Sequence, residues 1–147
     1  MIALALVGHS GDLLRALGAM VAQAAPSVPV VTAGGTATGS LGTSSPGILE
    51  ALRAALRASG GEGVVVLFDL GSAALALEVA LEELADADRA RIAVSDGPLV
   101  EGAVRAAVEA AGGAPLARVC AVADGERATA KLPPDWPDRP GGRRVAR

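Results

Sequence analysis

The run GVVVLFDL at residues 63–70 restricts the fold more than any other feature of the sequence. Its valines, leucine and phenylalanine form an unbroken apolar stretch that ends at Asp69. A strand that is apolar on both faces is typical of a parallel sheet, because helices cover both faces of such a sheet. The run therefore predicts a central parallel strand packed between two layers of helices.

The segments on either side of this run alternate between the two patterns that a parallel sheet requires. Short apolar runs predict further strands at residues 2–7, 28–32 and 91–94. Apolar residues at helical spacing predict helices over residues 12–23, 48–58, 73–84 and 100–111. Ser45 is the expected N-cap of the second helix, with Pro46 in its first turn. A last short strand is predicted at residues 116–122.

Repeated strand–helix units predict an α/β fold of three layers, α/β/α. Its centre is a mainly parallel sheet of four strands with a short additional edge strand. We expect one domain at residues 1–123, because a chain of 147 residues suits a single core. Residues 124–147 are rich in Pro, Gly and Arg and offer little to pack, so we expect a flexible carboxyl-terminal tail.

The composition argues against several classes of function. The net charge of −3 comes without a basic patch interleaved with aromatic residues, so nucleic acid is not an expected partner. Every apolar run is interrupted before the ~18 residues that a membrane span needs. The amino terminus lacks the basic region of a signal peptide. The single cysteine, Cys120, allows no internal disulfide and is expected to be a small buried residue. We therefore expect a cytoplasmic protein.

Polar residues follow each predicted strand, at the edge where an open α/β sheet binds its ligands. His9, the only histidine, follows the first strand, and a glycine-rich loop at residues 34–47 follows the second. Asp69 and Ser72 follow the third strand, and residues 95–98 follow the fourth. We expect this edge to gather an imidazole, a carboxylate, hydroxyl groups and glycine turns.

His9 alone has two interpretations, since an isolated histidine is more often structural than catalytic. Asp69 changes the balance, because a carboxylate at the end of an apolar strand is costly to bury without a partner. If the first and third strands are neighbours, Asp69 accepts a hydrogen bond from one nitrogen of the His9 ring and leaves the other as a nucleophile. Asp69 has an alternative role as N-cap of the helix that starts near Ser72, and the two roles are compatible.

Several common reactions lack the residues that they need. A Walker A loop requires Gly-Lys-Ser/Thr, but the only lysine is Lys131, and the sequence GHSGDL lacks the spacing of a dinucleotide motif. One histidine and one distant cysteine make a poor metal site, so no metal is expected. No G-x-S-x-G nucleophile elbow is present.

Phosphoryl transfer suits the residues that are present, because it asks mainly for positioning and for hydrogen-bond donors to the phosphoryl oxygens. Glycine turns and helix amino termini supply such donors, although the glycine-rich loop is equally well explained as a flexible connector. The candidate phosphate-binding residues are Ser10, Gly11, Gly35, Thr43, Gly71 and Ser72.

Four motifs, in order, resemble one family of phosphotransferases. They are LVGHS after the first strand, AGG…GTS after the second, DLGSAALALEVALE after the third and GPLVEGA after the fourth. The chain resembles DhaM, the phosphotransferase subunit of the bacterial PTS-dependent dihydroxyacetone kinases, whose domain is similar to the mannose-type IIA domains of the sugar phosphotransferase system. Members often have Ser where this chain has Gly8.

The resemblance implies a phosphohistidine relay. His9 would take a phosphoryl group from the phosphocarrier protein HPr and pass it to ADP bound on the DhaL subunit, and DhaK would hold the dihydroxyacetone. Asp69 would orient the imidazole. The resemblance also implies a homodimer, and no cofactor beyond the phosphoryl group carried on His9.

Two other functions remain as alternatives. The first is a IIA domain that serves a sugar permease, although DLGSA after the third strand resembles the dihydroxyacetone branch, whereas sugar IIA domains usually carry Gly-Gly-Ser there. The second is a regulatory binding module, in which phosphorylated His9 signals without passing its phosphate on.

Overall fold

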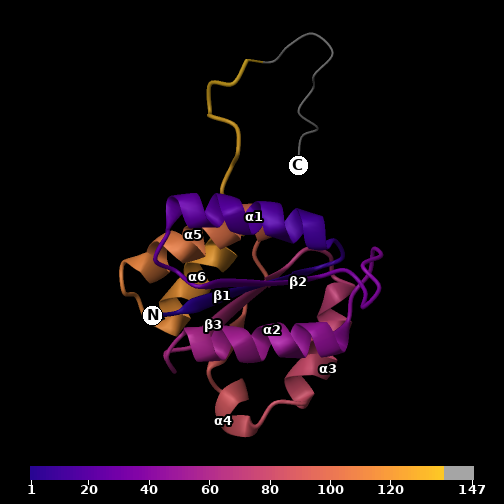
Figure 1. Cartoon of the computed structure of the whole chain (residues 1–147). Coiled ribbons are helices and arrows are strands. Elements are labelled where there is room, and N and C mark those ends of the chain that lie inside the picture. Colours follow the sequence, from indigo (N-terminus) through magenta and orange to yellow (C-terminus); the bar gives the residue numbers. More distant parts are fainter. Residues whose placement is uncertain (138–147) are drawn as a thin grey trace.

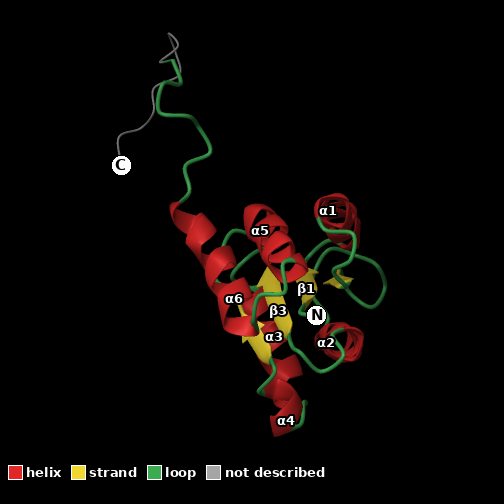
Figure 2. Ribbon diagram, turned by 90° about the vertical axis from the view of Figure 1, so that its left-hand side faces the viewer, coloured by secondary structure: helices red, strands yellow, loops and turns green. Residues whose placement is uncertain are grey.

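A single parallel sheet with helices on both faces forms the body of the protein. The computed structural model describes residues 1–137. Its four strands are β1 (Ala3–Gly8), β2 (Val30–Gly34), β3 (Val64–Phe68) and β4 (Ile92–Val94), in the spatial order β2-β1-β3-β4. All three pairings are parallel, so the carboxyl ends of the strands meet at one edge. The predicted three-layer α/β/α class is confirmed (Figures 1 and 2).

Helices cover both faces of the sheet. The helices are α1 (Gly11–Ala24), α2 (Ser45–Ala58), α3 (Ala73–Glu82), α4 (Asp86–Arg89), α5 (Leu99–Ala111) and α6 (Leu116–Gly125). In Figure 1, α1, α5 and α6 lie on one side of the sheet, and α2 and α3 lie on the other. The short helix α4 follows α3 and was not predicted, because four residues carry too little periodicity to be recognised.

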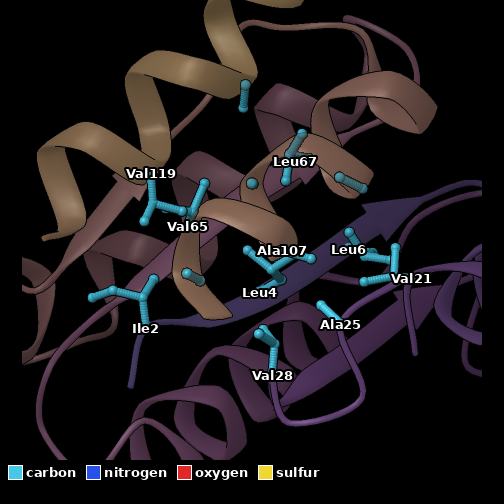
Figure 3. Packing of buried hydrophobic residues seen from close by; sticks show 14 of the residues in the cluster. Ile2, Leu4, Leu6, Val21, Ala25, Val28, Val65, Leu67, Ala107 and Val119 are labelled. Atoms are coloured by element: carbon cyan, nitrogen blue, oxygen red, sulfur yellow. The ribbon is translucent and has the colours of Figure 1, made fainter. Parts of the chain in front are cut away.

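The two central strands are buried on both faces, as the apolar run at residues 64–68 predicts. Alternate side chains of β1 point to opposite faces, so Leu4 and Leu6 enter one apolar cluster and Ala3, Ala5 and Val7 enter the other. Figure 3 shows the first cluster, in which Val119 of α6 lies near Val65 of β3. The small side chains let the helices lie close to the sheet, and this rigid packing fixes the strand ends in space.

Serine side chains cap the two helices that flank the glycine-rich loop. Ser10 accepts a hydrogen bond from the Leu13 N–H at the start of α1, and Ser44 accepts one from the Gly47 N–H at the start of α2. The N-cap of α2 is therefore Ser44 and not Ser45, which is the first residue of the helix. The sequence allows either Ser44 or Ser45 to be the N-cap. The extended backbone of Ser44 identifies it as the capping residue.

The predicted strand at residues 116–122 is wrong, because these residues form helix α6. Val119 and Ala123 are buried four residues apart, which places them on one face of a helix against the sheet. The approach is close: a Cβ at Gly97 would lie only 2.1 Å from the Ala123 carbonyl oxygen. The sheet therefore has four strands in the described part of the chain and no short fifth strand at its edge.

Helical structure extends a few residues beyond residue 123, where the sequence predicts the end of the domain. Helix α6 ends at Gly125 and is followed by a single 3-10 turn, η1 (Glu126–Ala128). Residues 129–137 then lead away from the sheet (Figure 2), and the rest of the predicted tail, residues 138–147, lies outside the described residues. No helix within residues 1–137 is long and apolar enough to cross a membrane.

Candidate functional site

His9 lies directly after β1, at the carboxyl edge of the sheet, and its backbone is fixed from two sides. Its N–H donates to Asp69 Oδ2 at 2.8 Å, and its carbonyl oxygen accepts a hydrogen bond from the Gly42 N–H at 2.9 Å. Asp69 follows β3 and Gly42 belongs to the glycine-rich loop after β2, so the site joins the ends of three strands. The imidazole is thus positioned by the sheet and does not depend on one flexible loop.

The His9 ring and the Asp69 carboxylate form the pair that the sequence predicts. His9 Nδ1 lies 2.9 Å from Asp69 Oδ1. This contact exists because β1 and β3 are neighbours, with Val7 paired to Phe68, so the residues after each strand face one another. An ionised carboxylate only accepts hydrogen bonds, so Nδ1 carries the proton and Nε2 keeps its lone pair. The side chains of His9 and Asp69 are 26% and 12% exposed, so the ring reaches solvent while the carboxylate is largely covered.

The pKa of the Asp69 carboxyl lies below 3.8, its ordinary value. Desolvation by burial raises this pKa, but hydrogen bonds from the His9 backbone N–H, from the His9 ring and from the Leu70 N–H lower it by more. The Leu70 bond is 2.7 Å long. Asp69 is therefore ionised at neutral pH and remains an acceptor for the Nδ1 proton.

Ser72 faces the other nitrogen of the ring. Its Oγ lies 3.0 Å from His9 Nε2 and donates to the lone pair there. Ser72 is the N-cap residue of α3, but its side chain makes no capping hydrogen bond in that helix, so the hydroxyl is directed to the imidazole instead. Asp69, His9 and Ser72 thus form a continuous line of hydrogen bonds, with the carboxylate at Nδ1 of the ring and the hydroxyl at Nε2.

Gly8 leaves the space that the Asp69 carboxylate occupies. A Cβ added at Gly8 would lie 2.6 Å from Asp69 Oδ2, closer than atoms of a folded protein approach without a shift. The absence of a side chain at residue 8 therefore lets the carboxylate reach both the backbone and the ring of His9.

The other candidate phosphate-binding residues are placed less directly against His9. The Ser10 hydroxyl accepts the capping bond of α1, and Gly11 is the first residue of that helix. Gly35 has a positive φ of 86° and donates its N–H to the Gly8 carbonyl oxygen, which fixes the start of the glycine-rich loop. Thr43 lies in the same loop, next to the Gly42 that binds His9. Gly71 precedes Ser72 and lines a groove beside Asp69.

A groove of about 920 Å³ opens beside Asp69. It is lined by the end of β3, by residues between β4 and the start of α5, and by the segment 126–132. The lining residues are Phe68, Asp69, Gly71, Asp96, Gly97, Pro98, Glu101, Glu126, Arg127, Thr129, Ala130, Lys131 and Leu132. The groove therefore shares the Asp69 turn with the His9 site.

Sequence reasoning missed the residue that ties α6 to the end of β4. Asp124 Oδ1 accepts hydrogen bonds from Ser95 Oγ at 2.6 Å and from the Asp96 N–H at 2.9 Å, which ties α6 to the end of β4. The sequence placed Asp124 in a flexible tail. The available signal was the helical spacing of Val119 and Ala123, which carries α6 as far as Asp124.

The side chains within residues 1–137 include no group of three or more His, Cys, Asp or Glu arranged to hold a metal ion. The chemistry that the site supports on its own residues is that of a nucleophilic imidazole, held at Nδ1 and exposed at Nε2.

Comparison with known proteins identifies the family. Residues 3–120 match the EIIA-man family, which is described as the PTS system fructose IIA component. The chain belongs to the EIIA-man family. The match covers the whole sheet and both layers of helices, and it confirms the family resemblance carried by the motifs after the strands.

Several relatives carry the name of phosphoryl donor subunit DhaM of a PEP-dependent dihydroxyacetone kinase. The one from Listeria innocua is 34% identical over 110 residues, which cover 74% of this chain and 86% of the relative. The one from Escherichia coli is 34% identical over 123 residues, which cover 81% of this chain but only 25% of the relative. The chain thus spans about a quarter of the Escherichia coli protein.

A solved structure shares the fold. The crystal structure of an unknown-function protein, EF1359, superposes with a TM-score of 0.74 at 29% sequence identity. The superposition covers 85% of this chain and 95% of the solved one, so the two folds agree over nearly their full extent.

Proposed function

We propose that the chain is a phosphohistidine relay protein, in which His9 Nε2 receives a phosphoryl group and passes it on to dihydroxyacetone kinase. One observation carries the proposal: Asp69 holds the Nδ1 proton of His9, and the opposite nitrogen points to Ser72 at the exposed edge. Membership in the EIIA-man family and the similarity to two DhaM phosphoryl donor subunits support it.

In the first step, the lone pair of His9 Nε2 attacks the phosphorus of a phosphohistidine on the carrier protein HPr. The new P–Nε2 bond forms while the P–N bond of the donor breaks, and the donor ring keeps the bonding electron pair. The His9 ring gains positive charge as Nε2 is committed, and the Asp69 carboxylate stabilises this charge through the Nδ1 proton. The Ser72 hydroxyl, 3.0 Å from Nε2, then donates to a phosphoryl oxygen.

In the second step, an oxygen of the terminal phosphate of ADP, held on the DhaL subunit, attacks the same phosphorus. The P–Nε2 bond breaks and its electrons return to the ring, which is neutral again with its proton on Nδ1. ATP formed on DhaL then phosphorylates the dihydroxyacetone held by DhaK. Neither transfer step requires a cofactor on this chain, because the chain carries only the covalent phosphoryl group. We also propose that the protein acts as a homodimer in the cytoplasm.

Reconstitution tests the relay. We mix the protein with phosphoenolpyruvate, enzyme I, HPr, DhaK, DhaL, ADP and dihydroxyacetone, and follow both the phosphoprotein and the sugar phosphate. The expected result is an acid-labile, alkali-stable phosphate on this chain and phosphoryl flow to dihydroxyacetone, both lost in His9→Ala. Because His9 is the only histidine, phosphate that persists in His9→Ala contradicts the proposal.

The same mixture separates the relay from the alternative of a sugar IIA domain. Replacing DhaK and DhaL by the sugar-specific components of a mannose-type system should leave the phosphate on His9 without onward flow. NMR of the phosphorylated protein identifies the nitrogen, and we expect Nε2 because Asp69 occupies Nδ1. A phosphate on Nδ1 would contradict the proposed role of Asp69.

A further inference from the structure

Two arginines of α2 differ from the other cations of the protein. Within residues 1–137, every Arg and Lys side chain forms an ion pair with a carboxylate, except those of Arg53 and Arg57. Both are exposed and lie four residues apart, so they share one face of the helix, where like charges repel. Arg57 lies in the last turn of α2, where a cation suits the helix dipole, but Arg53 lies before that turn. Helix stability therefore does not explain the pair.

The two side chains line the same cavity, which has a volume of about 440 Å³. The other lining residues belong to the turn before β3 and to the chain around α4 and the start of β4. Figure 1 shows α2 and α4 on the same side of the sheet. The cavity thus lies at the amino ends of β3 and β4, whereas His9 and Asp69 follow the carboxyl ends of their strands.

A third guanidinium group is held in place at this cavity. Arg91, directly before β4, forms an ion pair with Asp88 of α4. A Cβ added at Gly61 would lie 3.3 Å from Arg91 Nη1, so the guanidinium group lies close to the backbone of the turn. Gly60 and Gly61 have positive φ angles of 62° and 91°, which glycine adopts without strain. The turn therefore lines the cavity without adding side chains to it.

The cavity carries an excess of positive charge. Three guanidinium groups line it against one carboxylate, that of Asp88, although the chain as a whole has a net charge of −3. Asp88 is already paired with Arg91, so Arg53 and Arg57 have no counter-charge among the residues that the structure describes. A small ligand with two negative charges would supply the charge that is missing.

We propose that this cavity binds the phosphate group of a small molecule. A guanidinium group offers its N–H donors in a planar fork that matches two phosphate oxygens. A phosphate monoester carries about two negative charges at neutral pH, which balances the two unpaired arginines. The volume also falls within the range of ~300–1,000 Å³ that is usual for small-molecule sites. The inference does not depend on the proposed relay, because the cavity lies at the opposite edge of the sheet from His9.

An NMR titration of the full chain tests the site. Inorganic phosphate and glycerol 3-phosphate are added separately at low salt and about pH 7.5, where both are mostly dianionic. The expected result is a saturable shift of the Gly60 and Gly61 amide signals, which weakens when sodium chloride is added. Phosphate bound near His9 would shift the amides of Gly42 and Ser72 instead, so the titration separates the two edges of the sheet.

Variants of the two unpaired arginines test which side chains bind. Arg53→Gln combined with Arg57→Gln should weaken binding at the cavity by about tenfold or more, because two charge-assisted contacts are lost. Both side chains are exposed, so the fold should tolerate the change. Arg118→Gln is the matched control, since Arg118 is 62% exposed on α6 and lies outside the cavity lining. Its affinity for phosphate should equal that of the unaltered protein.

The two ligands also identify the source of the phosphate group. Tighter binding of glycerol 3-phosphate assigns the cavity to an organic phosphate, and equal or weaker binding assigns it to inorganic phosphate. Shifts confined to the amides around His9, or equal affinity in the double variant and the unaltered protein, would overturn the proposal. Failure of the relay has a different signature, because His9→Ala should lose the covalent phosphate and keep phosphate binding at the cavity.

Discussion

Two aspartates each bind residues at the carboxyl end of a parallel strand through nearly the same contacts, and they have different roles. Asp69, after β3, binds the N–H and the side chain of His9, which follows β1. Asp124, on α6, binds the Ser95 side chain and the Asp96 N–H, which follow β4. In both cases one carboxylate satisfies a backbone donor and a side chain where a parallel strand ends.

The difference lies in what the bound side chain can still do. The Ser95 side chain is enclosed, with the residue 1% exposed, and its hydroxyl also accepts the Gly97 N–H. The His9 ring has a second nitrogen, and its side chain is 26% exposed. The carboxylate thus has only a structural role at Ser95, whose hydroxyl is buried. At His9 it leaves a second ring nitrogen available for reaction.

Asp69→Ala is expected to have the largest effect on the rate of His9 phosphorylation. Without the carboxylate, the His9 ring loses the partner that orients it and fixes its proton on Nδ1, so phosphorylation of His9 should slow by about 100-fold or more. Rapid-quench measurement with phosphoramidate, which needs no partner protein, isolates the chemical step. A rate within about threefold of the unaltered protein would show that Asp69 acts only on the fold.

The converse substitution, Asp124→Ala, should act on stability and spare the chemistry. It leaves the buried Ser95 hydroxyl and the Asp96 N–H without their acceptor, which should lower the free energy of unfolding by about 1–3 kcal/mol. Chemical denaturation measures the loss, and the phosphoramidate rate of the folded variant should stay within about threefold. A large loss of rate without a loss of stability would remove the contrast between the two aspartates.

The two strand ends also differ in how well the sequence predicts their contacts. The apolar run ending at Asp69 and the position of His9 after another apolar run place both residues at one edge, because parallel strands end together. The His9–Asp69 contact then follows from a single assumption, that the two strands are neighbours. The role of Ser72 at Nε2 needs the geometry of the turn, which spacing does not supply.

The end of β4 was harder to predict because its partner lies on a segment with an ambiguous pattern. Leu116, Val119, Cys120 and Ala123 follow a helical spacing, but the short run around them also reads as a strand. The structure settles the choice through packing, with Val119 and Ala123 buried against the sheet. The groove wall depends on ion pairs between segments distant in sequence, and charge composition alone does not pair them.

A smaller effect is expected from Ser72→Ala, which removes the contact at the reactive nitrogen and leaves the Asp69 anchor intact. A single neutral hydrogen bond contributes about 0.5–1.5 kcal/mol, so the rate of His9 phosphorylation should fall by about two- to tenfold. Ser10→Ala is the matched control, since that hydroxyl caps α1 and should affect unfolding more than rate. Equal rates for both variants would place Ser72 outside the reaction.

The smallest effect is a pH dependence that separates the charge of Asp69 from its shape. The folded-state pKa of Asp69 lies below 3.8, because hydrogen bonds from His9 and Leu70 outweigh the burial that raises it. The native state therefore binds this proton less readily than the unfolded chain.

The stability that the carboxylate contributes is present above pH 3.8 and is lost as the pH falls through the folded pKa. The difference in unfolding free energy between the unaltered protein and Asp69→Asn should thus shrink as the pH falls below about 5, in urea titrations at each pH. Val119→Ala, in the apolar core, provides the control, because its destabilisation involves no titrating group and should not follow pH in this way. A difference for Asp69→Asn that stays constant or widens below pH 5 would mean that the carboxylate is not held as the anion, and the assignment of the Nδ1 proton would fail with it.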